Sequence, residues 1–96
     1  MPNLTPEQAR FKDWLQHPLL QRYTVYWDFS CKEVDLKNVA VAMDSLSHGE
    51  TLMLQFLVGV WMGEDHVHFD FFTAVWTLDK PHLDIIRAWL ADPFWP

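Results

Sequence analysis

The segment DHVHFDFF, residues 65–72, is the part of the sequence best suited to chemistry. His66, His68 and Asp70 stand at alternate positions, and alternate side chains of an extended backbone point to the same face. Two imidazoles and a carboxylate on one face could bind zinc, or iron as a facial triad. On this interpretation the protein is a small metal-dependent enzyme centred on His66 and His68.

A structural interpretation of the same segment competes with the metal site. Asp70 precedes an apolar stretch at helical spacing and is a suitable N-cap. A carboxylate that accepts hydrogen bonds from backbone amides is a poor metal ligand. The two histidines then lie on the open, polar face of a short strand. We favour this interpretation, so we expect no bound metal, no cofactor and no catalytic residue.

Cys31 is the only cysteine, and it lies between Ser30 and Lys32. A neighbouring cation can lower the pKa of a thiol, but no histidine or nucleophile motif accompanies Cys31, so we expect an incidental exposed thiol. A single cysteine excludes an intrachain disulfide, which is typical of a reducing compartment. Residues 1–10 lack the apolar stretch of a signal peptide, and the apolar run 52–62 is about half the length that a bilayer requires. We therefore expect a soluble cytoplasmic protein without a membrane partner.

The chain carries 13 acidic and 7 basic residues, which give a formal net charge of −6. The basic residues form no run, and this argues against binding to nucleic acid, which requires clusters of lysine and arginine. An acidic surface favours solubility or a basic partner. A further alternative is an acidic mimic of nucleic acid that occupies the binding site of another protein, although the carboxylates are spread along the chain.

Helix signals dominate the sequence. Apolar residues at helical spacing follow each of five suitable N-cap residues, namely Thr5, Asp35, Ser47, Asp70 and Asp79. Apolar spacing after Pro18 predicts a further helix that ends at Trp27. A length of 96 residues is that of one domain. We therefore expect one globular domain, residues 1–96, with an all-α fold: a compact bundle of about five short helices.

The segment 51–78 is ambiguous between helix and strand. Apolar residues at every second position between Leu52 and Met62 would suit one face of a strand. The polar or small residues Thr51, Gln55 and Gly59 are instead spaced by four, which is typical of a helix. We favour a mostly buried helix here. The alternative is an α+β fold with a hairpin at 51–78 that turns at residues 63–65.

The two halves of the chain share a pattern that resembles a paired EF-hand. In the first half Trp27 precedes a polar loop, the triplet Val34-Asp35-Leu36 and a helix; in the second half Trp61 precedes a polar loop, Phe69-Asp70-Phe71 and a helix. The resemblance implies two helix–loop–helix halves whose loops pair through Val34 and Phe69. Neither loop has the first ligand or the glutamate that an EF-hand needs, so we expect no calcium binding.

Aromatic residues are abundant: the chain has 6 tryptophans and 7 phenylalanines. We expect Trp61 and Trp76 in the core, because both lie on apolar stretches. Phe94 and Trp95 follow the last predicted helix and either fold back onto the body or bind a partner. A surplus of apolar surface suggests a partner, so the leading hypothesis is an interaction or regulatory module without catalysis. It binds a protein partner, which includes the option of a homodimer, with Phe94 and Trp95 at the interface.

Overall fold

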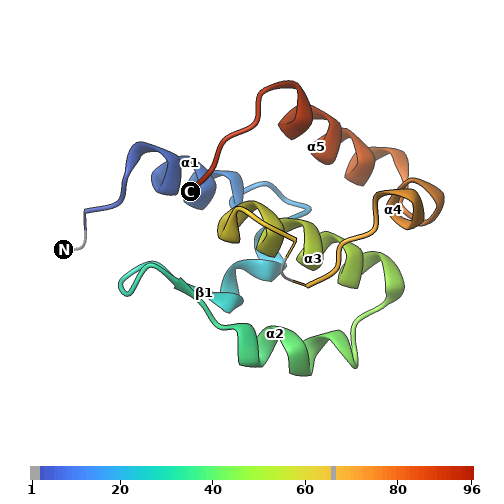
Figure 1. The fold of residues 1–96 in the computed structure, drawn as a ribbon, viewed down its shortest axis with the longest axis horizontal. Helices are drawn as coiled ribbons and strands as arrows, with labels where there is room; N and C mark the ends of the chain where they lie inside the picture. The colour runs from blue at the N-terminus through green and yellow to red at the C-terminus, as the bar shows by residue number, and fades with distance from the viewer. Residues whose placement is uncertain (1–2, 66) are drawn as a thin grey trace.

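The computed structural model of the protein describes residues 3–65 and 67–96. It is mostly helical and has a radius of gyration of 12.8 Å, as expected for a compact chain of this length. The elements are α1 (Pro6–Trp14), the 3-10 helix η1 (Gln21–Tyr26), β1 (Trp27–Asp28), β2 (Glu33–Val34), α2 (Leu36–Met43), α3 (His48–Met62), α4 (Phe71–Thr77) and α5 (Lys80–Ala91) (Figure 1).

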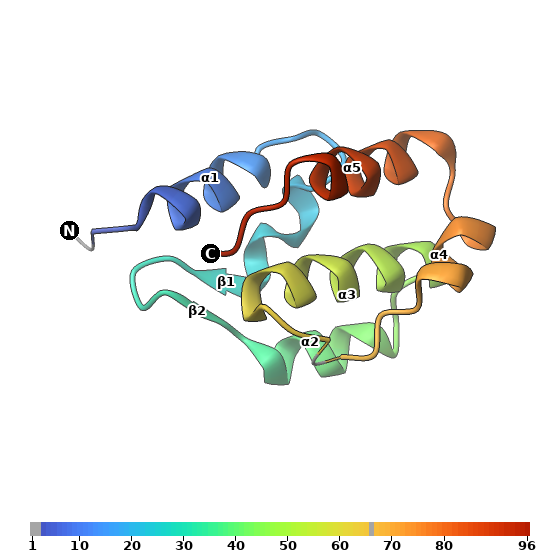
Figure 2. The same ribbon diagram turned by 45° about the horizontal axis from the view of Figure 1, so that its top comes forward.

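Helix α3 is the central element. Figures 1 and 2 show it between α2 on one side and α1 and α5 on the other. Apolar residues surround most of its circumference and are buried, namely Leu52, Met53, Leu54, Phe56, Leu57, Val58 and Val60. Thr51, Gln55 and Gly59 form a half-buried stripe. The predicted buried helix is confirmed, and the alternative hairpin at 51–78 is wrong because α3 and α4 occupy this segment.

The five predicted N-caps are confirmed, and they explain where the α-helices begin. Ser47 closes a capping box: its hydroxyl accepts from the Glu50 amide at 3.2 Å, and the Glu50 carboxylate accepts from the Ser47 amide at 2.9 Å. This capping box gives partners to two amides that otherwise lack an intrahelical hydrogen bond. At the other end of α3, Gly63 has a φ of 73°, and this left-handed conformation favours glycine and ends the helix.

The predicted helix from Pro18 to Trp27 is wrong in type and in length. The structure has a turn followed by η1, and Trp27 begins a strand. Tyr23, Thr24, Val25 and Tyr26 are aromatic or β-branched, and such side chains lose rotamer freedom in an α-helix. Their apolar spacing is real, since Tyr23 and Trp27 are both buried, but a 3-10 turn followed by a strand buries them as well as an α-helix would.

The predicted pairing of Val34 with Phe69 is also wrong. Val34 pairs with Trp27 in a two-residue antiparallel hairpin, β1–β2. The turn between these strands closes locally: the Asp28 carboxylate accepts from the amides of Ser30, at 2.9 Å, and Cys31, at 3.2 Å. A local contact of this kind costs less loop entropy than a pairing with a segment 35 residues away. The bridge that the EF-hand resemblance implied is therefore replaced by a hairpin within the first loop.

Aromatic rings form the part of the core between α1, β1 and α3. The ring of Phe11 is fully buried and lies 5.9 Å from Trp14, 5.1 Å from Trp27 and 5.0 Å from Trp61 between centroids. Trp61 is half-buried against this cluster. Trp76 is 92% exposed, so its predicted place in the core is wrong.

Acid should destabilise the fold through its capping carboxylates. Hydrogen bonds from the Thr73 hydroxyl and amide hold the pKa of Asp70 below its usual range, and bonds from the His82 ring and amide do the same for Asp79. A carboxyl whose pKa is lower in the folded state stabilises that state above its ordinary pKa and loses this effect as the pH falls through the folded value. We expect the free energy of unfolding to fall from about pH 4 downward, measured by urea denaturation.

The control for the acid effect is Asp70→Asn, because asparagine caps a helix about as well as aspartate and does not titrate. The variant should be nearly as stable as the wild type at neutral pH and should lose less stability in acid. An acid profile identical to that of the wild type would contradict the role of this cap.

Candidate interaction surface

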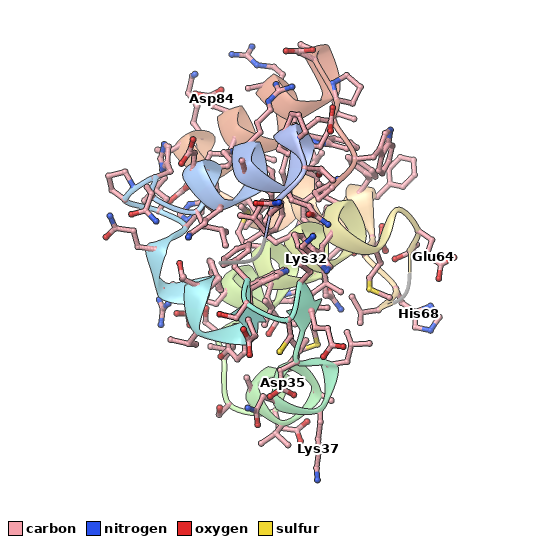
Figure 3. The ribbon with its side chains drawn as sticks, turned by 90° about the vertical axis from the view of Figure 1, so that its left-hand side faces the viewer. Lys32, Asp35, Lys37, Glu64, His68 and Asp84 are labelled. Atoms are coloured by element: carbon pink, nitrogen blue, oxygen red, sulfur yellow. The ribbon has the colours of Figure 1, made fainter. Side chains whose placement is uncertain are left out.

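The structure describes two of the three candidate metal ligands, Asp70 and His68. Asp70 caps α4: its carboxylate accepts from the Phe72 amide at 2.9 Å, from the Thr73 amide at 3.3 Å and from the Thr73 hydroxyl at 2.9 Å. His68 has a φ of 60°, so the backbone is not extended there, and its side chain points away from the body of the molecule (Figure 3). His66 lies outside the described residues. Among the described residues, no three His, Cys, Asp or Glu side chains gather as a metal site requires.

Cys31 is exposed in the turn of the hairpin, as predicted. The carboxylate of Asp28 raises the pKa of the thiol through a hydrogen bond and its negative charge. The sequence had raised the option that Lys32 lowers the pKa of the thiol; this is wrong in direction, because the pKa is raised.

We expect Cys31 to react slowly with iodoacetamide at mildly alkaline pH, because the thiolate is the nucleophile and its fraction is reduced. Asp28→Asn removes the negative charge and keeps a side chain that can accept the turn hydrogen bonds. The variant should therefore alkylate faster than the wild type, as followed by mass spectrometry. Equal rates would show that Asp28 does not control the thiol.

A polar hollow of about 420 Å³ lies between η1 and the first turns of α3 and α5. Its charged side chains are paired with one another. Arg22 forms an ion pair with Glu50, and the His82 ring lies 2.5 Å from the Asp79 carboxylate. These pairs are internal, and Glu50 and Asp79 also cap helices, so the charged side chains of the hollow already have partners within the chain.

Helix α4 carries the two most exposed aromatic side chains of the described residues. Phe72 is 90% exposed and Trp76 is 92% exposed, and they are one turn apart. Two positions along a helix turn the side chain by about 200°, so Trp76 lies opposite Ala74, which is buried against the body. Phe71 and Val75, also one turn apart, lie between these two faces and are exposed as well. One broad side of α4, formed by these four residues, is thus apolar and uncovered.

Two apolar grooves extend this surface over α5. The first, here called the tail groove, has a volume of about 330 Å³ and lies between the end of α3, the end of α5 and Trp95. The second, the α4–α5 groove, has a volume of about 430 Å³ and contains Val75, Leu83 and Ile86. Phe71 and Leu90 line both grooves. The grooves therefore form one continuous apolar surface with these two residues at its middle.

The two predicted interface residues have different surroundings. Phe94 is 8% exposed and packs on α1, 5.5 Å from the Trp14 ring and 4.2 Å from the Arg10 guanidinium. Trp95 is 56% exposed, packs edge-on against Trp89 at 5.0 Å and lines the tail groove. The C-terminal segment therefore both docks onto the body and adds to the exposed apolar surface: Phe94 does the first and Trp95 the second.

The charged residues at the edges of this surface differ in sign. Glu64 and Asp65 line the tail groove. Lys80, Asp84 and Arg87 line the α4–α5 groove, and Asp84 lies 2.9 Å from the Lys80 amine and 3.2 Å from the Arg87 guanidinium. Figure 3 shows Glu64 and Asp84 well apart. One edge thus has two carboxylates, and the other has two cations that share one carboxylate.

The exposed face of α4 was missed from the sequence, although the sequence contains a signal for it. In FFTAVWT the single small residue, Ala74, marks the side that packs closely, and the side opposite it holds Phe72 and Trp76. A broad apolar side on a helix is covered either by the rest of the chain or by a partner. Because α4 has only 7 residues, its apolar content alone does not distinguish these cases.

Comparisons with protein-family models, with curated proteins and with solved structures find no match to this chain. Within the described residues, no helix combines the length and the apolar character needed to cross a membrane. The case for a function therefore rests on the surface itself.

Proposed function

We propose that the protein is a small non-catalytic interaction module, an adaptor or regulator, that binds a protein partner through the apolar surface of α4, α5 and Trp95. The observation that carries this proposal is the exposure of Phe72 and Trp76 on the outer side of α4. Water-exposed apolar area costs roughly 25 cal/mol per Å² relative to burial. A partner that covers these rings removes that cost.

The size of the surface supports the same conclusion. The four aromatic residues Phe71, Phe72, Trp76 and Trp95 together expose the equivalent of nearly three whole side chains. At 150–250 Å² each, this amounts to roughly 400–700 Å². The largest apolar patch on a typical monomer is about 300–600 Å² and is often functional. Aromatic residues are also enriched among the side chains that contribute most to binding.

Site-specific photo-crosslinking in cells of the source organism tests the proposal. A photoreactive phenylalanine analogue replaces Phe72 in one sample and Val41 in the other. Val41 is also exposed but lies on α2, away from the surface. We expect defined protein adducts from position 72, lost when Leu90→Glu is added, and none of these adducts from position 41. Equal adducts from both positions, or none from position 72, would reject the proposed surface.

A further inference from the structure

We propose that the partner on this surface is a second copy of the same chain, packed face to face about a two-fold axis that passes beside Phe71 and Leu90. This inference rests on the proposed function and names the partner that the surface fits. The two α5 helices then lie antiparallel across the axis, and α4 of each copy lies over the tail groove of the other.

The arrangement of the two grooves is what a two-fold contact requires. In such a contact each surface meets itself, so a feature on one side of the axis faces the feature on the other side. Helix α4 lies beside the first turn of α5 (Figure 1), whereas the tail groove lies at the last turn of α5, beside Trp95. Rotation about the middle of the surface therefore brings the projecting rings of Phe72 and Trp76 to the tail groove of the second copy. The groove has an apolar lining to receive them.

The charges at the two edges are complementary under the same rotation. The edge with Glu64 and Asp65 faces the edge where Lys80 and Arg87 share Asp84. The first edge has a formal charge of −2 and the second of +1, from two carboxylates and from two cations with one carboxylate. Opposite signs thus meet on both sides of the axis. Complementary edges of this kind fix the orientation of two partners.

The exposed area matches what a stable dimer needs. A specific interface buries about 800 Å² on each partner. The exposed rings supply roughly 400–700 Å² of this, and Val75, Leu90 and the charged edges add the remainder. Binding to a membrane surface fits less well, because the formal net charge of −6 is repelled by anionic lipids.

Sedimentation velocity over the micromolar range tests the dimer, with the full chain at physiological salt. We expect the wild type to change from monomer to dimer with concentration. Leu90→Glu places two carboxylates together at the axis and should weaken the dimer by at least about tenfold. Val41→Glu adds the same charge on α2 and should leave it unchanged. Circular dichroism of each variant in dilute solution checks the fold.

A charge-reversal cycle tests the two-fold geometry independently of any effect on folding. Arg87→Glu changes the second edge from +1 to −1, so that it repels the first edge, and should weaken the dimer most. Glu64→Lys changes the first edge from −2 to 0, so that it loses its attraction to the second edge, and should weaken the dimer less. In the double variant an edge of formal charge 0 faces an edge of −1, so the repulsion introduced by Arg87→Glu is removed and the dimer should be tighter than that of Arg87→Glu alone. A double variant as weak as the sum of the two single changes would overturn the arrangement.

The remaining outcomes show whether the dimer alone is wrong or whether the proposed function is wrong as well. A wild type that stays monomeric throughout this range overturns the dimer. If position 72 still crosslinks to other proteins, the interaction module stands and only its partner is different. If the monomeric wild type co-sediments with anionic phosphatidylserine vesicles and Leu90→Glu does not, the surface binds membranes and both proposals fail.

Discussion

Replacing Phe11 with alanine should lower the free energy of unfolding by about 3–5 kcal/mol, the range for phenylalanine removed from a packed core. The ring of Phe11 is fully buried and contacts the rings of Trp14, Trp27 and Trp61. These neighbours come from α1, β1 and α3, so the cavity cannot close by a shift of one element. Domains of this size are stabilised by about 5–15 kcal/mol, so the variant should lose a large part of its stability.

Urea denaturation followed by circular dichroism measures this loss. The matched control is Phe72→Ala, the same substitution at a ring that is exposed on α4. In dilute solution, where α4 has no partner, the control should change the stability by no more than about 0.5 kcal/mol. If the two variants lost comparable free energy of unfolding, α4 would pack against the body more closely than its exposure indicates.

Replacing Phe94 with alanine should lower the free energy of unfolding by about 3 kcal/mol, although the residue lies in an irregular segment beyond the last helix. Its ring is buried against α1, beside Trp14 and under the Arg10 guanidinium. Burial of the ring and its cation–π contact, worth about 0.5–1 kcal/mol at an exposed site, are both lost. The hydrogen bond from the Trp89 indole to the Phe94 carbonyl, 3.2 Å, uses the backbone and remains.

The neighbouring residue provides the control. Trp95→Ala removes a larger ring, but that ring is half exposed and contacts Trp89 alone among the ring pairs of the described residues. We expect the free energy of unfolding to fall by about 1 kcal/mol in dilute solution.

At concentrations where the dimer forms, Trp95→Ala should also weaken self-association. If Trp95→Ala cost more stability than Phe94→Ala, the two residues would have the opposite roles. Thermal melts at low and high protein concentration separate the two effects.

The sequence predicted the helices that begin at capping residues because an N-cap acts locally. The side chain of Ser47 bonds to an amide three residues away, and this geometry follows from spacing alone. The buried helix α3 was also predictable, since its half-buried residues recur every four positions. In contrast, the 3-10 helix before Trp27 was predicted as an α-helix because both bury the same side chains.

The partner of a strand and the exposure of a helix could not be predicted in the same way. The pairing of Trp27 with Val34 depends on a turn stabilised by Asp28, and the sequence contains no hairpin signal with glycine there. The exposure of Trp76 depends on which side of α4 faces α3, and this is decided by tertiary packing. An apolar helix face looks the same in sequence whether the same chain or another molecule covers it.

The central position of α3 has a consequence for how the chain folds during its synthesis. A helix that is apolar over most of its circumference needs cover on several sides, and part of that cover comes from later segments: α4 packs on α3, and the Trp89 ring of α5 lies 5.6 Å from the Phe56 ring. These later segments leave the ribosome after α3 does. The cover of α3 is therefore complete only once α5 has been synthesised, so we expect nascent chains that are stopped before α5 to expose part of residues 52–60 to chaperones.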